Sequence, residues 1–234
     1  MRLAQLKNGY RYNSDTLVLY DFISSFQSLK HKVLDVGCGC GILGLLLKRD
    51  FPKISLFGID LQDINTKIST HNARLNTLEA NFQTIDFRKF KSDERFENIV
   101  LNPPFYSKGA LESTSEHLNL SRYAKHLKLD EFLSVANSHL TPNGTLYFCY
   151  ESRAIDEIFI KFHTLKLKPT VLKFVHSTNN EPSKLVLVKA QKNSHSKCTV
   201  LAPLFMQENG RHSKKAEEIF KRANTLSEDY DVRG

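Results

Sequence analysis

The segment Asn102-Pro103-Pro104-Phe105 contains residue types that can hold an amino group attached to a flat ring or a carbonyl. Such a nitrogen is a poor nucleophile because its lone pair is delocalised into the π system. The Asn102 side-chain oxygen and the Pro103 carbonyl could accept both N–H hydrogens and localise that lone pair toward an incoming alkyl group. The prolines fix φ and stiffen the loop, and Phe105 offers a face for stacking a base. We predict that Asn102, Pro103, Pro104 and Phe105 are catalytic; the alternative is an ordinary strand terminator.

A second segment, Asp35-Val36-Gly37-Cys38-Gly39-Cys40-Gly41, predicts a turn that carries a cofactor. Glycines let a ligand approach the backbone closely, and a helix predicted to follow offers free N–H groups at its start. The run from Gly39 to Gly44 also matches the dinucleotide pattern G-x-G-x-x-G. Asp35 favours S-adenosylmethionine over a dinucleotide, because a carboxylate repels a pyrophosphate and attracts the ammonium group of S-adenosylmethionine. We expect S-adenosylmethionine at Asp35, Gly37, Gly39 and Gly41; a nicotinamide cofactor and a turn without a ligand are the alternatives.

Two further carboxylates stand at the ends of predicted strands, where ligands of open α/β sheets bind. Asp60 would hold the ribose hydroxyls of the cofactor, and Asp86 would accept from its adenine amino group. The alternative for Asp86 is a helix cap or a solvated turn residue. The four cysteines have neither the spacing of a zinc site nor that of a disulfide framework, so we predict no metal.

Short apolar runs alternate with amphipathic stretches along the chain, which is the pattern of strands alternating with helices. Thr141-Pro142-Asn143-Gly144 predicts a helix stop, and the segment 177–182 predicts the loose tip of a hairpin. The fold class is therefore α/β: a doubly wound, mostly parallel sheet with a C-terminal antiparallel hairpin. The predicted strands are 33–36, 55–60, 82–86, 96–101, 145–150, 171–175 and 185–189, and the predicted helices are 42–47, 64–75 and 129–140.

Length and composition suit one soluble domain, with 234 residues of which 41% are hydrophobic. No apolar run approaches about 18 residues, and the start of the chain lacks a signal-peptide run, so we expect a cytoplasmic protein without a membrane span. The formal net charge of +8 favours polyanionic partners. Eight lysines and a single acid, Glu181, lie between Lys161 and Lys197. These lysines could guide an RNA backbone or simply form a solvated face.

The segments 35–41 and 102–105 both resemble motifs of class I S-adenosylmethionine-dependent methyltransferases. Asp35 with Gly37, Gly39 and Gly41 resembles the first motif of that class, and the segment 102–105 resembles its [DNS]-P-P-[YFW] motif, here in the form NPPF. The Asn form of this motif is found in enzymes that act on amino groups of adenine or guanine in RNA and on a glutamine of release factors. The resemblance implies a Rossmann-like methyltransferase sheet and methylation of an amino nitrogen.

The N-terminal stretch 5–19 is similar to the opening of the bacterial family that methylates adenine 37 of valine tRNA at N6. That similarity implies that Tyr12, Asp15 and Thr16 lie over the cofactor; an arm that merely packs on the sheet is the alternative. It also implies a single methyltransferase domain over 1–234, with an N-terminal arm at 1–30, a catalytic core at 31–190 and a C-terminal extension at 191–234.

We therefore expect an enzyme that methylates adenine N6 in RNA, with tRNA as its partner and a monomer as the favoured state. Guanine N2 of ribosomal RNA and a protein glutamine are alternative acceptors for the same chemistry. A non-catalytic RNA-binding module with this fold and a nicotinamide oxidoreductase are alternatives of another class.

Overall fold

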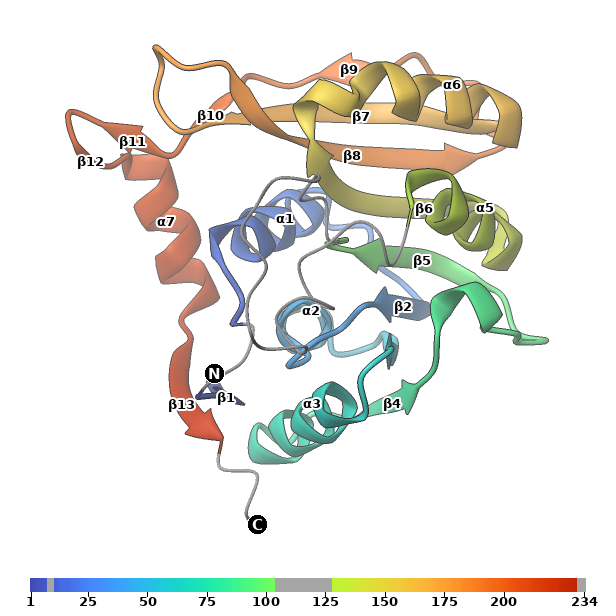
Figure 1. Ribbon diagram of the computed structural model, residues 1–234, viewed down its shortest axis with the longest axis vertical. Helices are drawn as coiled ribbons and strands as arrows, with labels where there is room; N and C mark the ends of the chain where they lie inside the picture. Colours follow the sequence, from blue (N-terminus) through green and yellow to red (C-terminus); the bar gives the residue numbers. More distant parts are fainter. Residues whose placement is uncertain (8–10, 104–127, 231–234) are drawn as a thin grey trace.

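The computed structural model describes residues 1–7, 11–103 and 128–230. A central sheet crosses the molecule in the order β10-β7-β8-β6-β5-β2-β3-β4, with β9 beside β7 (Figure 1). Strands β4, β3, β2, β5 and β6 run parallel to one another, whereas β8 runs antiparallel to both β6 and β7. The mostly parallel sheet with a C-terminal antiparallel hairpin is thus confirmed. Its strands are Lys32–Val36 (β2), Ser55–Asp60 (β3), Ala80–Thr84 (β4), Phe96–Leu101 (β5), Leu140–Glu151 (β6), Leu167–His176 (β7), Ser183–Lys192 (β8), Thr199–Val200 (β9) and Leu204–Phe205 (β10).

Helices cover both faces of this sheet and make a three-layer molecule. One face carries Ser14–Ser25 (α1), Ile42–Asp50 (α2), Asp63–Leu75 (α3) and Lys214–Ala223 (α7). The other carries Leu129–His139 (α5), Ile155–Leu165 (α6) and the single turns Phe87–Lys89 (η1) and Ser152–Ala154 (η3).

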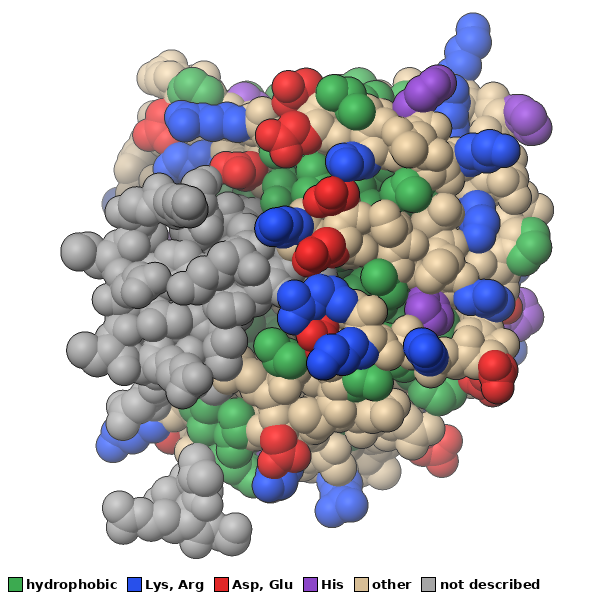
Figure 2. Space-filling model, turned by 45° about the vertical axis from the view of Figure 1, so that its right-hand side comes forward, with side chains coloured by type: hydrophobic (Ala, Val, Ile, Leu, Met, Phe, Trp, Pro, Cys, Tyr) green, Lys and Arg blue, Asp and Glu red, His purple; other side chains and the backbone are tan. Residues whose placement is uncertain are grey.

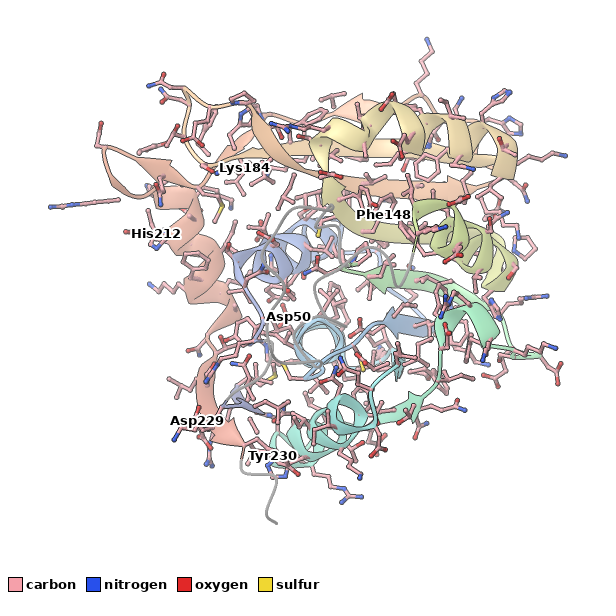
Figure 3. All side chains as sticks on the ribbon, in the orientation of Figure 1. Asp50, Phe148, Lys184, His212, Asp229 and Tyr230 are labelled. Atoms are coloured by element: carbon pink, nitrogen blue, oxygen red, sulfur yellow. The ribbon has the colours of Figure 1, made fainter. Side chains whose placement is uncertain are left out.

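The central strands β2, β5, β6 and β8 are largely buried on both faces, which explains the apolar runs at 99–101, 146–150 and 185–188. Along β6, Tyr147 and Cys149 join the core under α1, and Leu146 and Phe148 join the core under α5 and α6. Phe148, labelled in Figure 3, has its ring centre 5.5 Å from that of Phe132. Alternate residues of one strand therefore hold together two different helical layers.

Several boundaries differ from the prediction by a few residues, and β7 and β8 are each longer than predicted at both ends. The helix α5 ends at His139, but the segment 141–144 is not a free turn, because β6 already begins at Leu140. The register between β5 and β6 shifts there, since Phe96 pairs with Leu140 and Asn98 with Thr145, and a bulge takes up the extra residues. The strand β4 ends at Thr84, two residues before the predicted end.

The two ends of the described chain meet beside α3, away from the central sheet (Figure 1). Strand β1 (Arg2–Leu6) pairs in parallel with β13 (Leu226–Tyr230). The other edge of β1 faces α3. The side chains of Asn72 in α3 and Asn76 directly after it exchange hydrogen bonds with the backbone of Ala4 and Arg2, respectively. A small hairpin of Gln207–Glu208 (β11) and Arg211–His212 (β12) precedes α7.

Candidate functional site

A pocket opens at the carboxyl ends of β2, β3 and β5, where the chain order in the sheet reverses and α/β proteins bind ligands. Gly41 does not line it, and Pro104 and Phe105 lie outside the described residues. The remaining sequence-predicted site residues do line it, and these are Tyr12, Asp15, Thr16, Asp35, Gly37, Gly39, Asp60, Asp86, Asn102 and Pro103.

The glycine turn has the left-handed backbone that glycine tolerates best, with φ of 67° at Gly37, 55° at Gly39 and 82° at Gly41. The Gly39 N–H donates to Asp60 Oδ2 at 2.9 Å, which ties the turn to the end of β3. Gly41 serves packing instead, because a Cβ there would lie 2.9 Å from Cβ of Ser69 on α3. The turn thus presents Gly37 and Gly39 to the pocket and seats Gly41 against a helix.

Asp35 lies at the floor of the pocket and is only 1% exposed. Its Oδ2 accepts from the Gly44 N–H at 2.9 Å. A Cβ at position 44 would lie 2.8 Å from that oxygen, so glycine is needed there. Burial raises the pKa of Asp35 to about 7, and the nearby charge of Asp60 adds to the increase. Sequence reasoning gave Gly44 no role, although its place in the glycine pattern was the available signal.

Asp60 is held at the end of β3 by three donors. Its Oδ2 accepts from Gly39 N, and its Oδ1 accepts from Gln62 N at 2.9 Å and Asn65 Nδ2 at 3.1 Å. Gln62 and Asn65 also line the pocket, and sequence reasoning missed both. Such fixed carboxylate geometry is what two ribose hydroxyls require.

Asp86 lies just after β4 as the N-cap of η1, accepting from Arg88 N at 2.9 Å. The Arg88 guanidinium also donates to both of its oxygens and lowers the pKa of Asp86. The cap that sequence reasoning gave as the alternative is therefore present, while the residue still lines the pocket.

The charges around the pocket indicate the sign of its ligand. Asp15, Asp35, Asp60 and Asp86 line it, and no described lining residue is a lysine, arginine or histidine. Burial raises the pKa of Asp15 as well. Asp86 is paired with Arg88, but a pyrophosphate would still meet the like charges of Asp15, Asp35 and Asp60, whereas the ammonium and sulfonium of S-adenosylmethionine would meet opposite charge. The residues present therefore fit S-adenosylmethionine and do not fit a dinucleotide.

Asn102 stands at the mouth of the pocket, directly after β5, and is held from two sides. Its Nδ2 donates to Thr16 Oγ1 of α1 at 2.9 Å, and its Oδ1 accepts from Cys149 Sγ of β6 at 2.9 Å. Thr16 thus lines the pocket and also contacts the candidate catalytic side chain. Cys149 was not predicted, because its proximity depends on the register between β5 and β6.

Tyr12 closes one side of the pocket and is anchored by the far end of the chain. Its hydroxyl lies 2.8 Å from Thr225 Oγ1 and 3.2 Å from Ser227 Oγ, and its backbone N–H donates to Gln5 Oε1 at 3.0 Å. Gln5 Nε2 in turn donates to Ser227 Oγ at 2.8 Å. No local signal in the sequence connects positions 12 and 227.

A second, more open groove adjoins the first and shares Asn13 and Asp15 with it. It runs past Arg153 after β6 toward the tip of the β7–β8 hairpin and the start of α7. Lys184 and His212 line its far part, and Figure 3 shows both at the end of the molecule where α7 begins. A ligand in the near part of this groove would therefore contact Asn13 and Asp15, which also line the pocket.

Within 1–7, 11–103 and 128–230, no three His, Cys, Asp or Glu residues are grouped as they would be around a metal ion. In the same ranges no helix has both the length and the apolar character to cross a membrane.

Comparisons with known proteins agree with this geometry. A family described as the methyltransferase small domain matches residues 16–166. The chain is 34% identical to a release factor glutamine methyltransferase of Flavobacterium psychrophilum over 54% of the chain and 47% of that protein. It is 24% identical to a tRNA1(Val) (adenine(37)-N6)-methyltransferase of Porphyromonas gingivalis over 68% of the chain and 65% of that protein. The chain thus spans between about half and two thirds of the length of these relatives.

Among solved structures, a predicted O-methyltransferase from Agrobacterium tumefaciens has a TM-score of 0.68 at 15% identity, covering 92% of this chain and 99% of its own. That likeness shows the fold, and the family match covers more than half of the chain. The chain therefore belongs to the methyltransferase small domain family, with the fold of class I methyltransferases and S-adenosylmethionine as its cofactor.

Proposed function

We propose that this protein transfers a methyl group from S-adenosylmethionine to N6 of adenine in tRNA, with adenine 37 of valine tRNA as the target. The observation that carries the proposal is the juxtaposition of Asn102 and Pro103 with a pocket lined by four carboxylates. Asn102 and Pro103 suit an amino group conjugated to a ring, and the four carboxylates suit a cationic cofactor. The tRNA-modifying relative and the N-terminal stretch support adenine as the acceptor.

Different residues of the pocket would bind different parts of the cofactor. Asp35 and the turn at Gly37 and Gly39 would hold the amino-acid end, and Asp60 would hold the ribose. Asp86 would face the adenine ring, with Tyr12, Asp15 and Thr16 closing the pocket from the N-terminal side. When bound, the cofactor supplies a methyl group activated by a positive sulfonium.

At the acceptor, Asn102 Oδ1 and the Pro103 carbonyl would each accept one N–H of the target amino group. With the cofactor bound, the nitrogen lone pair would form the new N–C bond as the C–S bond breaks with its electrons going to sulfur, and the nitrogen would release one proton to water. None of these steps needs a strong base, so alignment of nitrogen, carbon and sulfur supplies most of the acceleration. Pro104 and Phe105 remain predicted members of this site.

The proposal is tested by methyl transfer from labelled S-adenosylmethionine to tRNA that lacks its native modifications, followed by mass spectrometry of the nucleosides. We expect label in N6-methyladenosine, reduced by about a hundredfold or more in Asn102→Ala, since the acceptor that orients the amino group is lost. Asn98→Ala is the matched control. Asn98 is a buried asparagine of β5, the strand that Asn102 follows, and its Nδ2 donates to Lys30 O, outside the pocket.

A second acceptor is an amide nitrogen of a protein glutamine, which the release factor relative favours. Asn102 and Pro103 would present the same two acceptors to that nitrogen. Label in a release factor and none in tRNA would contradict the adenine proposal and support this one. Absence of S-adenosylmethionine binding would contradict both.

A further inference from the structure

We infer that Cys149 and Thr16 are positioning residues for Asn102, which together fix the orientation of its side-chain amide before the acceptor arrives. This inference deepens the proposed function and rests on it, because it concerns the group that would hold the target nitrogen. Neither residue would contact the reacting atoms. Both act through Asn102.

The three side chains come from three different elements that meet at one point of the sheet. Thr16 belongs to the first turn of α1, Asn102 follows β5, and Cys149 lies in β6. The pairing of Leu101 with Phe148 places the next residue of each strand, Asn102 and Cys149, side by side. Cys149 is fully buried and Thr16 is only 5% exposed, so water competes little for these contacts.

The chemistry of the two neighbours selects one of the two possible amide orientations. Burial holds the pKa of the Cys149 thiol well above its ordinary value, so the sulfur carries its proton. An S–H group is a weak donor and a poor acceptor, and it therefore favours the amide oxygen over the amide nitrogen. At the other side, Thr16 Oγ1 accepts from Nδ2. Turning the amide over would set Nδ2 against a thiol donor and Oδ1 against Thr16.

Orientation matters because the amide oxygen has two lone pairs. With one directed at Cys149, the other can accept from the target amino group. A free asparagine side chain would spend part of its time with the donor Nδ2 facing the target, and that arrangement repels an N–H. Preorganised acceptors act because they need no rearrangement when the reaction occurs.

The competing interpretation is that Cys149 only fills space in the core under α1. Two substitutions by residues of nearly equal size distinguish the positioning role from the space-filling role. Cys149→Ala removes the donor, whereas Cys149→Ser keeps an O–H that can reach Oδ1. In the same way, Thr16→Val removes the acceptor and Thr16→Ser keeps it. The control is Tyr147→Phe, which removes a polar atom from a buried residue on the same face of β6, where its hydroxyl lies 3.4 Å from Ser28 Oγ.

With unmodified tRNA as the acceptor, we expect kcat to fall about tenfold in Cys149→Ala and Thr16→Val and to stay within about threefold in Cys149→Ser and Thr16→Ser. For the Cys149 pair, KM for the tRNA, the Kd for S-adenosylmethionine and Tm should change little. The inference is wrong if Cys149→Ala keeps the wild-type kcat, or if Cys149→Ser loses as much as Cys149→Ala.

A spectroscopic readout separates failure of this inference from failure of the proposed function. In protein labelled with ¹⁵N-asparagine, the side-chain signals of Asn102 are identified by their loss in Asn102→Ala. We expect these signals to shift in Cys149→Ala and to return toward the wild-type position in Cys149→Ser. If the wild-type protein methylates no tRNA but the Asn102 signals still shift in Cys149→Ala and return in Cys149→Ser, the proposed acceptor is wrong and the positioning role stands. Unchanged Asn102 signals in Cys149→Ala would overturn the positioning itself.

Discussion

At the scale of single residues, the proposed contact between Asp35 and the cofactor would couple cofactor binding to the release of a proton. Its pKa of about 7 arises from burial, and an ammonium group beside it would favour the ionised form. Binding therefore releases a proton below about pH 7, and the affinity for S-adenosylmethionine should rise between about pH 5 and pH 7. Isothermal titration in two buffers of different ionisation enthalpy measures that proton. Asp35→Asn should bind about tenfold more weakly or worse and lose the pH dependence.

The same carboxyl affects the stability of the cofactor-free protein with a defined sign. The folded-state pKa is raised above the ordinary 3.8, so between about pH 4 and pH 7 the unfolded chain releases a proton that the folded protein keeps. The free energy of unfolding therefore falls as pH rises through this window and levels off above it. Denaturant titrations should show this slope flattened in Asp35→Asn. Asp86→Asn is the control, because Arg88 lowers the pKa of Asp86 below that window.

Two glycines of the same turn should respond differently to alanine. Both have positive φ, but a Cβ at Gly41 would lie 2.9 Å from Ser69, whereas a Cβ at Gly39 meets no atom within 4 Å. Gly41→Ala should lower the free energy of unfolding by about 2–4 kcal/mol, from backbone strain and from the shift of α3. Gly39→Ala should cost only about 1–2 kcal/mol and should weaken cofactor binding, since Gly39 lines the pocket. Equal losses of stability in both variants would contradict this division.

At the scale of elements, the terminal strand pair completes the pocket with residues outside the family-matched range 16–166. Leu6 and Tyr12 line the pocket. Leu6 pairs with Tyr230 of β13, and the Tyr12 hydroxyl contacts Thr225, directly before β13, and Ser227 within it. Asn72 joins β1 to the glycine turn, because its Nδ2 donates to both Ala4 O and Cys40 O. The C-terminal strand thus supports residues that line the pocket without lining it itself.

Removing residues 225–234 should therefore weaken S-adenosylmethionine binding by about tenfold or more, with a smaller loss from Ser227→Ala, because several hydrogen bonds that order the arm are lost. Arg2→Ala is the control within the same strand pair. Its ion pair with Glu228 is well exposed and should contribute little. Fluorescence or calorimetric titration measures the affinity. A truncated protein that binds as tightly as the full chain would show that the arm is ordered without β13.

At the scale of the whole molecule, the lysine-rich stretch does not form one basic face. Lys161 pairs with Asp130, Lys184 with Glu181, and Lys192 donates to a backbone carbonyl. Lys189 lies over the Phe26 ring at 4.1 Å. Figure 2 shows a face on which basic and acidic side chains alternate. A count of charges along the sequence therefore overstates the local field that an RNA would meet.

The register of the β7–β8 hairpin places these lysines at two opposite ends of the sheet. Leu185 pairs with Glu151 at the end of β6, near the pocket, whereas Lys192 pairs with Leu167 at the opposite end of the sheet. The exposed side chains of Lys166 and Lys168 therefore lie far from the site, and Lys184 and Arg153 lie beside the groove next to it.

Charge reversal should consequently distinguish the two ends. Arg153→Glu with Lys184→Glu should weaken binding of unmodified tRNA and reduce the slope of log affinity against log salt by about 1 per lost phosphate contact. Lys166→Glu with Lys168→Glu should leave both quantities nearly unchanged. Filter binding at several salt concentrations measures them. The opposite ranking would mean that the RNA approaches over the amino end of the sheet.

The sequence by itself determined the layered sheet and most of the pocket. Strands β3 and β5 were predicted to the residue, because each contains buried apolar residues, such as Ile99, Val100 and Leu101, that are typical of central parallel strands. Asp35, Asp60 and Asn102 could be assigned to one edge, because residues at the carboxyl ends of parallel strands must converge. These inferences need only local pattern and a known sheet geometry.

Tertiary structure alone decided which residues far apart in the chain touch. The contact of Cys149 with Asn102 depends on the register of β6, which a bulge at 141–144 shifts, and no local pattern encodes that bulge. The pairing of β1 with β13 joins segments more than two hundred positions apart. Both features arise from the packing of complete elements, so the alternation of apolar and polar residues could indicate the elements but not these contacts.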